Sequence, residues 1–332
     1  MPVTIADIRA ANVRLAPVVR RTPVLHSPFL DDIAGRRVLV KAECLQHTGS
    51  FKFRGAWSAL SAMQPDQRAR GVIAFSSGNH AQGVALAAKM HGVPAVIVMP
   101  ADAPRMKIEN TRALGGEVVL YDRGSQDRDI IGAALAHERG LNLVKPFDDP
   151  MVIAGQGTAG LEMAEQLKAM GETPQQLLVC CGGGGLTSGI ALAAAETLPD
   201  TKVHPVEPQG FDDVARSLRS GNIETNNRLS GSLCDAIITP RPGDLTFPIL
   251  AAHCGHGIAV TEDEALHAVA LAWARLKIVV EPGGAVALAA ALFHGDKFTG
   301  DSVAVVTTGG NVDQDVFLRA LSLPAFQASM NV

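Results

Sequence analysis

Short apolar runs alternate with amphipathic segments along most of this chain. In the first half, the runs at residues 72–75, 95–99 and 117–121 have the length and the β-branched content of buried strands. Each run is followed by a segment with helical periodicity, and these segments cover residues 81–90, 104–114 and 126–138. This half of the chain therefore predicts a repeated strand–helix unit.

Before these units, Thr4 and Asp7 form a capping box for a helix that runs to about residue 20, and residues 37–43 are predicted to form a strand. After them, a second series follows the same rhythm, with strands predicted at residues 177–181, 202–206 and 302–307. Helices are predicted at residues 158–170, 186–195, 262–277 and 284–292. The stretch 224–248 has no period and is rich in Pro, Gly, Ser and Asn, and long irregular segments of this kind are often functional.

Alternating strands and helices predict an α/β fold with parallel sheets covered on both faces. Of the 332 residues, 47% are hydrophobic and 4% are aromatic, so Ala, Val, Leu and Ile must fill the cores. We predict a large domain from residues 1–66 and 150–332, and a small domain from residues 67–149. The chain is expected to cross between them near residues 55–67 and 148–155.

Composition excludes several classes of function. The net charge is −4 and no basic stripe is visible, which argues against a nucleic-acid partner. No apolar run reaches the roughly 18 residues that a membrane span needs, and the N-terminus does not read as a signal peptide. Five cysteines without a CxxC pair suggest neither a disulfide framework nor a zinc site. We expect a cytoplasmic enzyme with a small-molecule substrate.

The first candidate site is the segment 48–55, TGSFKFRG, between a strand and a predicted helix. A desolvated lysine such as Lys52 has a lowered pKa and forms Schiff bases with carbonyl groups. The alternative is an ordinary solvated lysine at the start of a helix.

Two further segments join the end of a strand to the start of a helix, where free backbone N–H groups bind anions. Ser76, Ser77, Asn79 and His80 stand in the first, which suits a carboxylate, although helix capping would explain one of them. The second has the four glycines 182–185, which let N–H groups converge on a phosphate. Neither a P-loop nor a convincing dinucleotide fingerprint is present.

Two other segments carry polar groups whose role is open from the residues alone. Thr308 follows the last predicted strand, where its hydroxyl could meet a ring nitrogen, and a glycine turn is the alternative. Glu207, Asp212 and Asp213 cluster around a short turn. Carboxylates with a backbone carbonyl between them suit a hard divalent cation, and a solvated acidic turn is the alternative.

Taken together and in this order, the motifs resemble the fold-type II pyridoxal-phosphate enzymes, specifically the serine/threonine dehydratase and serine racemase branch. The resemblance implies the tryptophan synthase β-like fold, with two open twisted α/β domains that contain parallel sheets. The matching segments are residues 21–23, 41–55, 76–82, 154–158, 182–185, 207–213, 281–282 and 308–313.

The resemblance assigns cofactor roles to the matching positions. Lys52 would carry pyridoxal 5'-phosphate and later move the Cα proton of the substrate. Phe51 would lie near the pyridine ring, Asn79 would hydrogen-bond its phenolic oxygen, and Thr308 would face its nitrogen. The phosphate would be held by the backbone N–H groups of Gly182, Gly183, Gly184, Gly185 and Leu186.

Substrate and metal roles follow in the same way. Ser76, Asn79 and His80 would bind the substrate carboxylate, and Ser77 would stand where racemases place a second acid or base. Arg128 aligns with an arginine that approaches a second substrate carboxylate. A divalent cation (Mg²⁺, Mn²⁺ or Ca²⁺) would be bound by Glu207, the carbonyl of Phe211 and Asp213.

The implied activity is dehydration of a β-hydroxy amino acid such as L-threonine or L-serine to a 2-oxo acid and ammonia. Dehydration of 3-hydroxyaspartate or racemisation of serine is the alternative within the family, and relatives imply a homodimer. A non-catalytic regulator on this fold is disfavoured by the intact Lys52. Two departures bear on the substrate pocket: Ala236 stands where relatives commonly have glycine, and Gly283 replaces a common hydroxyl residue.

Overall fold

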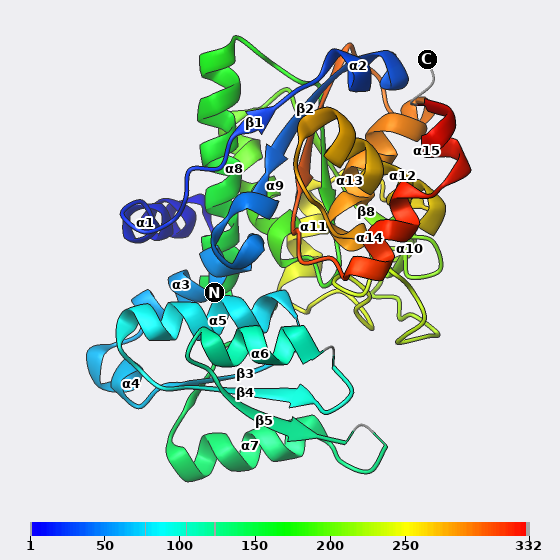
Figure 1. Cartoon of the computed structure of the whole chain (residues 1–332). Helices are drawn as coiled ribbons and strands as arrows, with labels where there is room; N and C mark the ends of the chain where they lie inside the picture. Colours follow the sequence, from blue (N-terminus) through cyan, green and yellow to red (C-terminus); the bar gives the residue numbers. More distant parts are fainter. Residues whose placement is uncertain (1, 77, 104, 123, 330–332) are drawn as a thin grey trace.

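Two open sheets, each covered by helices, form two units of unequal size (Figure 1). The computed structural model describes residues 2–76, 78–103, 105–122 and 124–329. The smaller unit, coloured cyan to green, lies below the larger one in Figure 1. The predicted pair of parallel-sheet α/β units is confirmed.

The larger sheet has six strands in the order β1-β2-β10-β7-β8-β9, and all neighbours are parallel except β1 with β2. Its strands are β1 (Val24–Leu25), β2 (Arg37–Ala42), β7 (Gln176–Cys180), β8 (Lys202–Pro208), β9 (Ile258–Val260) and β10 (Ser302–Thr307). The helices of this unit are α1 (Ile5–Leu15), α2 (Pro28–Ala34), α8 (Pro150–Met170), α9 (Gly185–Thr197), α10 (Asp213–Ser220), α11 (Thr246–His253), α12 (Glu262–Leu271), α13 (Pro282–Phe293), α14 (Gln314–Leu321) and α15 (Pro324–Ser329).

The smaller sheet has four parallel strands in the order β5-β4-β3-β6. They are β3 (Val72–Phe75), β4 (Ala95–Pro100), β5 (Glu117–Tyr121) and β6 (Asn142–Leu143), and they all fall inside the range 67–149 predicted for the small domain. The accompanying helices are α4 (Pro65–Ala69), α5 (Asn79–His91), α6 (Arg105–Ala113) and α7 (Arg128–Arg139), and α3 (Lys52–Ala62) packs between α5 and α8.

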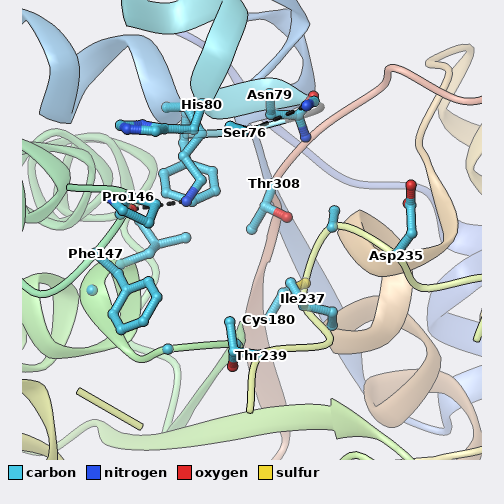
Figure 2. A pocket seen from close by; sticks show the side chains of 18 of the residues that line it. Ser76, Asn79, His80, Pro146, Phe147, Cys180, Asp235, Ile237, Thr239 and Thr308 are labelled. Atoms are coloured by element: carbon cyan, nitrogen blue, oxygen red, sulfur yellow. Dashed lines mark hydrogen bonds between the residues drawn. The ribbon is translucent and has the colours of Figure 1, made fainter. Parts of the chain in front are cut away.

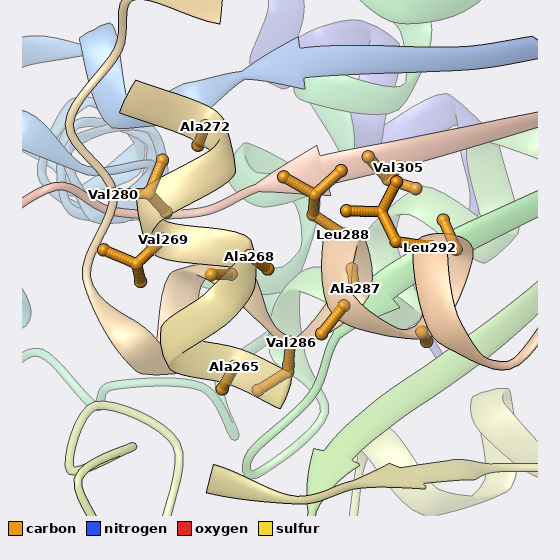
Figure 3. Close-up of a cluster of buried hydrophobic side chains, with 14 of the residues drawn as sticks. Ala265, Ala268, Val269, Ala272, Val280, Val286, Ala287, Leu288, Leu292 and Val305 are labelled. Atoms are coloured by element: carbon orange, nitrogen blue, oxygen red, sulfur yellow. The ribbon is translucent and has the colours of Figure 1, made fainter. Parts of the chain in front are cut away.

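Both faces of the larger sheet are buried, and alternate side chains of one strand pack into the cores on its two sides. On β10, Val303 and Val305 face α12 and α13, whereas Ala304 and Val306 face α8 and α9. Figure 3 shows the first of these cores, in which α13 residues such as Leu288 pack against Val305. This two-sided burial explains why the strands read as continuous apolar runs.

Glycines allow the helices beside the site to approach closely. A Cβ on Gly155 of α8 would lie 2.6 Å from the Arg54 carbonyl oxygen of α3, and one on Gly189 of α9 would lie 2.6 Å from the Gly157 nitrogen. Backbone cannot yield to such contacts. The motif at residues 154–158 therefore has a packing role between α3, α8 and α9.

A buried ion network ties α3 to β2 and α8. Arg54 donates two hydrogen bonds to the Glu43 carboxylate, both 2.8 Å long, and one of 3.1 Å to Glu162. Lys41 donates to the other oxygen of Glu162 at 2.5 Å and to the Thr22 carbonyl at 2.7 Å. Burial alone would raise the pKa of Glu43, but the Arg54 guanidinium, together with Lys41 and the Thr22 hydroxyl, outweighs this and lowers it.

Several predicted limits were wrong. Helix α8 begins at Pro150 rather than at residue 158, because Asp149 accepts hydrogen bonds from the first backbone N–H groups, and the expected crossing at 148–155 is thus mostly helical. After Leu271 the chain winds into a π-helical turn, Ala272–Leu276, instead of continuing as α-helix to residue 277. The irregular stretch expected to reach residue 248 ends where α11 begins.

No helix among the described residues combines the length and apolarity that crossing a membrane requires.

The ion network makes a prediction about stability. Arg54→Met should lower the free energy of unfolding by about 3–5 kcal/mol, since it leaves buried carboxylates without their partner. Urea denaturation measures this. The matched control is Arg21→Met, because the Arg21–Glu165 pair is 58% and 62% exposed and should contribute less than about 1 kcal/mol. Equal losses in the two variants would contradict a special role for the buried network.

Candidate active site

The topology brings the predicted motifs to one edge of the larger sheet. Strands β2, β10 and β7 are neighbours, so the loops after their carboxyl ends lie together, which is where ligands bind in open α/β sheets. These loops carry Lys52, Thr308 and the glycine run, and the loop after β3 adds Ser76. Together they line a cavity of about 250 Å³, slightly below the roughly 300–1,000 Å³ found for small-molecule sites.

Lys52 stands at the first position of α3 and its ammonium lies inside this cavity. Its Nζ donates to the Pro146 carbonyl at 2.9 Å and lies 5.1 Å from the centroid of the Phe51 ring. Burial lowers the pKa of Lys52 to about 8, and Glu281 opposes this shift in part. A larger fraction of the amine is therefore neutral, and nucleophilic, near neutral pH than for a solvated lysine.

The glycine run forms a tight loop at the start of α9. Gly184 has φ +91°, which L side chains rarely adopt, and a Cβ on Gly183 would lie 2.4 Å from the Phe147 ring. The Thr246 hydroxyl donates to the Gly183 carbonyl at 2.6 Å and fixes this peptide plane. Gly185 and Leu186 open the helix, so their backbone N–H groups have no partner within it, and both residues line the cavity, as a phosphate site requires.

Thr308 and Cys180 close the end of the cavity beside the carboxyl ends of β10 and β7 (Figure 2). Thr308 is buried, and its carbonyl accepts from the Phe51 N–H at 3.1 Å, which ties the strand end to the lysine segment. Burial raises the pKa of Cys180 to about 11, so the thiol stays protonated. Both groups facing the cavity here are neutral. Cys180 was not among the predicted site residues.

Asn79 belongs to a chain of side-chain hydrogen bonds that sequence analysis missed. Its amide nitrogen donates to Glu281 at 2.5 Å, and its oxygen accepts from Asn311 at 2.7 Å. Burial raises the pKa of Glu281 to about 7, although the bond from Asn79 opposes it. The signal was available, because Glu281 is an acid placed directly before the buried, Ala-rich helix α13.

The predicted carboxylate-binding segment lies at the start of α5. Ser76 lines the cavity, and its hydroxyl accepts from the Gly78 N–H at 3.2 Å. The His80 ring hydrogen-bonds the Val144 carbonyl at 2.8 Å, and burial, followed by the Lys52 charge, lowers its pKa to about 3. The ring is thus neutral and already partnered, so His80 would reach a carboxylate through its backbone N–H. Ser77 lies outside the described residues.

Charged side chains from both units line the rim. Arg128, to which the family resemblance assigns a second substrate carboxylate, stands at the start of α7 and lines the cavity. Lys107 of α6 also lines it and forms a salt bridge of 3.2 Å with Asp235 of the irregular segment. Lys107 and Asp235 were not predicted as site residues, and no local motif marks Lys107 in the sequence.

Glu207 and Asp213 are buried and lie at the end of β8 and the start of α10. Glu207 accepts from the Val214 and Ala215 N–H groups at 3.0 and 2.7 Å, while one oxygen of Asp213 is buried without a hydrogen-bond partner among the residues that the structure describes. Burial, and then the Asp213 charge, raise the pKa of Glu207. Among the described residues no group of three or more His, Cys, Asp or Glu side chains could hold a metal, so a cation would need backbone and water ligands.

Comparisons with known proteins agree with this geometry. The family model for "Pyridoxal-phosphate dependent enzyme" matches residues 15–309. The chain is 42% identical to L-threo-3-hydroxyaspartate ammonia-lyase from Pseudomonas sp, over 95% of this chain and 97% of that protein. It is 40% identical to L-threonine ammonia-lyase from Thermotoga maritima, over 96% of this chain and 78% of that protein. The structure of maize serine racemase superposes with a TM-score of 0.90 at 36% identity, covering 97% of each chain.

The raised pKa of Glu281 predicts a pH dependence of stability. Its carboxyl is protonated in both states below pH about 4.5, and above pH about 7 the folded state must bury a charge. The free energy of unfolding should therefore fall by up to about 3 kcal/mol as the pH rises through this window. Urea denaturation at several pH values, with chelator present, measures this. The free energy of unfolding of Glu281→Gln should change less with pH than that of the wild type. Identical slopes in the two proteins would refute the assignment.

Proposed function

The chain belongs to the family of pyridoxal-phosphate dependent enzymes, and on this basis we propose that it is an ammonia-lyase that removes water and ammonia from a small β-hydroxy amino acid. The observation that carries the proposal is the Lys52 amine, with its lowered pKa, in the same cavity as the glycine loop. The family predicted from the motifs is confirmed.

The residues present fit the cofactor. The glycine loop and Leu186 would hold its phosphate, Lys52 would bind its carbonyl carbon, and Asn79 has a further N–H for its phenolic oxygen. A Cβ at Gly183 would displace Phe147, so the loop has no room for side chains. When bound, pyridoxal phosphate supplies the electron sink that makes the substrate Cα acidic.

The protein residues would then share the proton and charge transfers. The start of α5, with Ser76, would fix the substrate carboxylate. The Lys52 amine would remove the Cα proton, since a pKa near 8 matches a general base at neutral pH. Thr308, a neutral group, would leave the ring nitrogen without a charged partner. This favours rapid loss of the β-hydroxyl over prolonged storage of charge at Cα.

L-Threonine and L-serine are the substrates that the family resemblance of the motifs favours first. A specific observation favours 3-hydroxyaspartate as a second candidate, because Arg128 lines the cavity and a guanidinium pairs with a carboxylate through two parallel hydrogen bonds. A relative at 42% identity carries that activity in its name. Serine racemisation is the remaining alternative, and it would use Ser77.

We also propose a divalent cation (Mg²⁺, Mn²⁺ or Ca²⁺) at Glu207, the Phe211 carbonyl and Asp213. Two neighbouring buried carboxyl groups, one with an oxygen that has no partner in the described part of the chain, are costly without a compensating charge. A cation completed by waters would supply that charge.

A homodimer in the cytoplasm, with neither nucleic acid nor membrane as a partner, remains our proposal for the assembly. In its support, the large apolar side chains of Phe29, Trp273 and Leu318 are at least 43% exposed. Exposed apolar surface of this kind is typical of protein interfaces.

Purified protein incubated with L-threonine, L-serine and L-threo-3-hydroxyaspartate should release a 2-oxo acid, and Lys52→Ala should abolish this release and the visible absorbance of the loaded cofactor. The variant should keep its far-UV circular dichroism. A parallel chiral assay for D-serine tests the racemase alternative. Wild-type turnover by Lys52→Ala would overturn the assignment of the lysine.

Chelation should lower the melting temperature, and Mg²⁺, Mn²⁺ or Ca²⁺ should restore it, because an ion that binds the native state alone stabilises it. Asp213→Asn removes one carboxylate and should abolish the response to these ions in differential scanning fluorimetry. Asp212→Asn, which changes the neighbouring, partly exposed acid, is the matched control and should keep it. The cation assignment fails if the Asp213 variant responds like the wild type.

A further inference from the structure

Lys107 separates two cavities. The active-site cavity of about 250 Å³ and a second cavity of about 180 Å³ share three lining residues: Lys107, Asp235 and Glu281. Lys107 comes from α6 of the smaller unit, whereas the two acids come from the larger unit. Its ammonium therefore stands between the units at the rim of the site.

The Lys107 ammonium is charged and surrounded by carboxylates. Its side chain is 12% exposed, and its Nζ lies 3.2 Å from the Asp235 carboxylate. Burial lowers its pKa, but Asp235, Asp313 and Glu281 together outweigh burial and raise it. Burying a charged ammonium is costly unless an anion pairs with it.

The two acids that reach both cavities differ in how firmly they are held. Glu281 is buried, and its carboxylate accepts from Asn79. Asp235 is 60% exposed and belongs to the irregular segment between α10 and α11, so it can turn into solvent at little cost. Asp235 is the partner that an incoming anion can replace. Its position also shows that a carboxylate fits against Lys107 at the rim.

We propose that Lys107 is a second specificity-determining residue beside Arg128: it binds the distal carboxylate of a dicarboxylic β-hydroxy amino acid in exchange for Asp235, and its charge adds to that of the Arg128 guanidinium, which lines the same cavity. The inference rests on the proposed function and names the substrate class that the rim selects. With the α-carboxylate at the start of α5, the substrate side chain is what remains to reach the rim. Threonine offers a methyl group there and leaves the Lys107–Asp235 pair intact, whereas 3-hydroxyaspartate offers a carboxylate.

Asp235 gives this arrangement its selectivity. An ammonium has three N–H donors and can bind a new carboxylate as the old one leaves. For a substrate with one carboxylate, Asp235 keeps the ammonium neutralised and the rim closed by a salt bridge. The same acid repels a second carboxylate until it moves, so its removal should favour dicarboxylic ligands.

The experiment compares Lys107→Gln, Lys107→Arg and Asp235→Asn with the control Arg112→Gln. Arg112 lies on the same helix, is 48% exposed and pairs with Glu109, so its variant loses the same charge away from the cavity. Initial rates give KM and kcat for L-threo-3-hydroxyaspartate and L-threonine. Calorimetric titration of the cofactor-loaded proteins with succinate and with butyrate measures binding of ligands that differ in one carboxylate.

Lys107→Gln should lower the ratio of kcat/KM for 3-hydroxyaspartate over threonine by about tenfold or more, mainly through KM, and weaken succinate more than butyrate. Lys107→Arg should retain most of the ratio, and Asp235→Asn should tighten succinate by about threefold. Arg112→Gln should change neither ratio.

Equal effects of Lys107→Gln on the two substrates and the two ligands would overturn the inference and make the salt bridge structural. The inference is overturned in the same way if Arg112→Gln shifts the ratio equally. If the wild type releases no 2-oxo acid from any substrate, the proposed function fails instead, and the succinate and butyrate titrations still decide the role of Lys107.

Discussion

Burying two cations and two carboxylates beside the first turn of α3 is the constraint on which the site depends. Arg54 lies two residues after Lys52 and is fully buried. Its guanidinium donates to the carboxylate of Glu43, in the turn after β2, and to that of Glu162 on α8. Such buried charges tolerate little displacement from their partners, so the ion network holds the first turn of α3 in a fixed position. Lys52 thereby reaches the cavity from a rigid base, which positions its amine better than a loop would.

The remaining site groups lie in loops that follow the ends of strands, and the strand order of the sheet makes these loops neighbours. Residues far apart in sequence meet because β2, β10 and β7 are adjacent and parallel, and the isolated bridge between Ser50 and Gly309 joins two of their loops. Close helix packing through Gly155 and Gly189 brings α8 and α9 to the same edge. The cavity is thus lined by neutral groups at Thr308 and Cys180 and by charged groups at its rim.

Much of this could be predicted from the sequence, since two-sided burial gives apolar runs and strand ends carry the polar motifs. Lys52, the glycine loop, Ser76 and Thr308 stand in such local patterns, and the cavity brings them together. Lys107 and Asp235 could not be found this way. Their significance arises from a contact between separate units, and an isolated lysine or aspartate has no local signature. The early start of α8 was missed because glycines at 155 and 157 weaken a helical pattern that tertiary packing stabilises.

The strands of the smaller sheet all lie within residues 72–143, and Ser76, Lys107 and Arg128 lie in that same span. The groups expected to hold the cofactor come almost entirely from the rest of the chain. Residues at the entry and exit of the span are joined, since the Asn142 side chain donates to the carbonyls of Gln67 and Gly71. In the proposed function, most groups that hold the cofactor and three that face the substrate thus come from different stretches of the chain. Recombination that exchanges this internal segment would replace Ser76, Lys107 and Arg128 together and leave Lys52, the glycine loop and Asp235 in place.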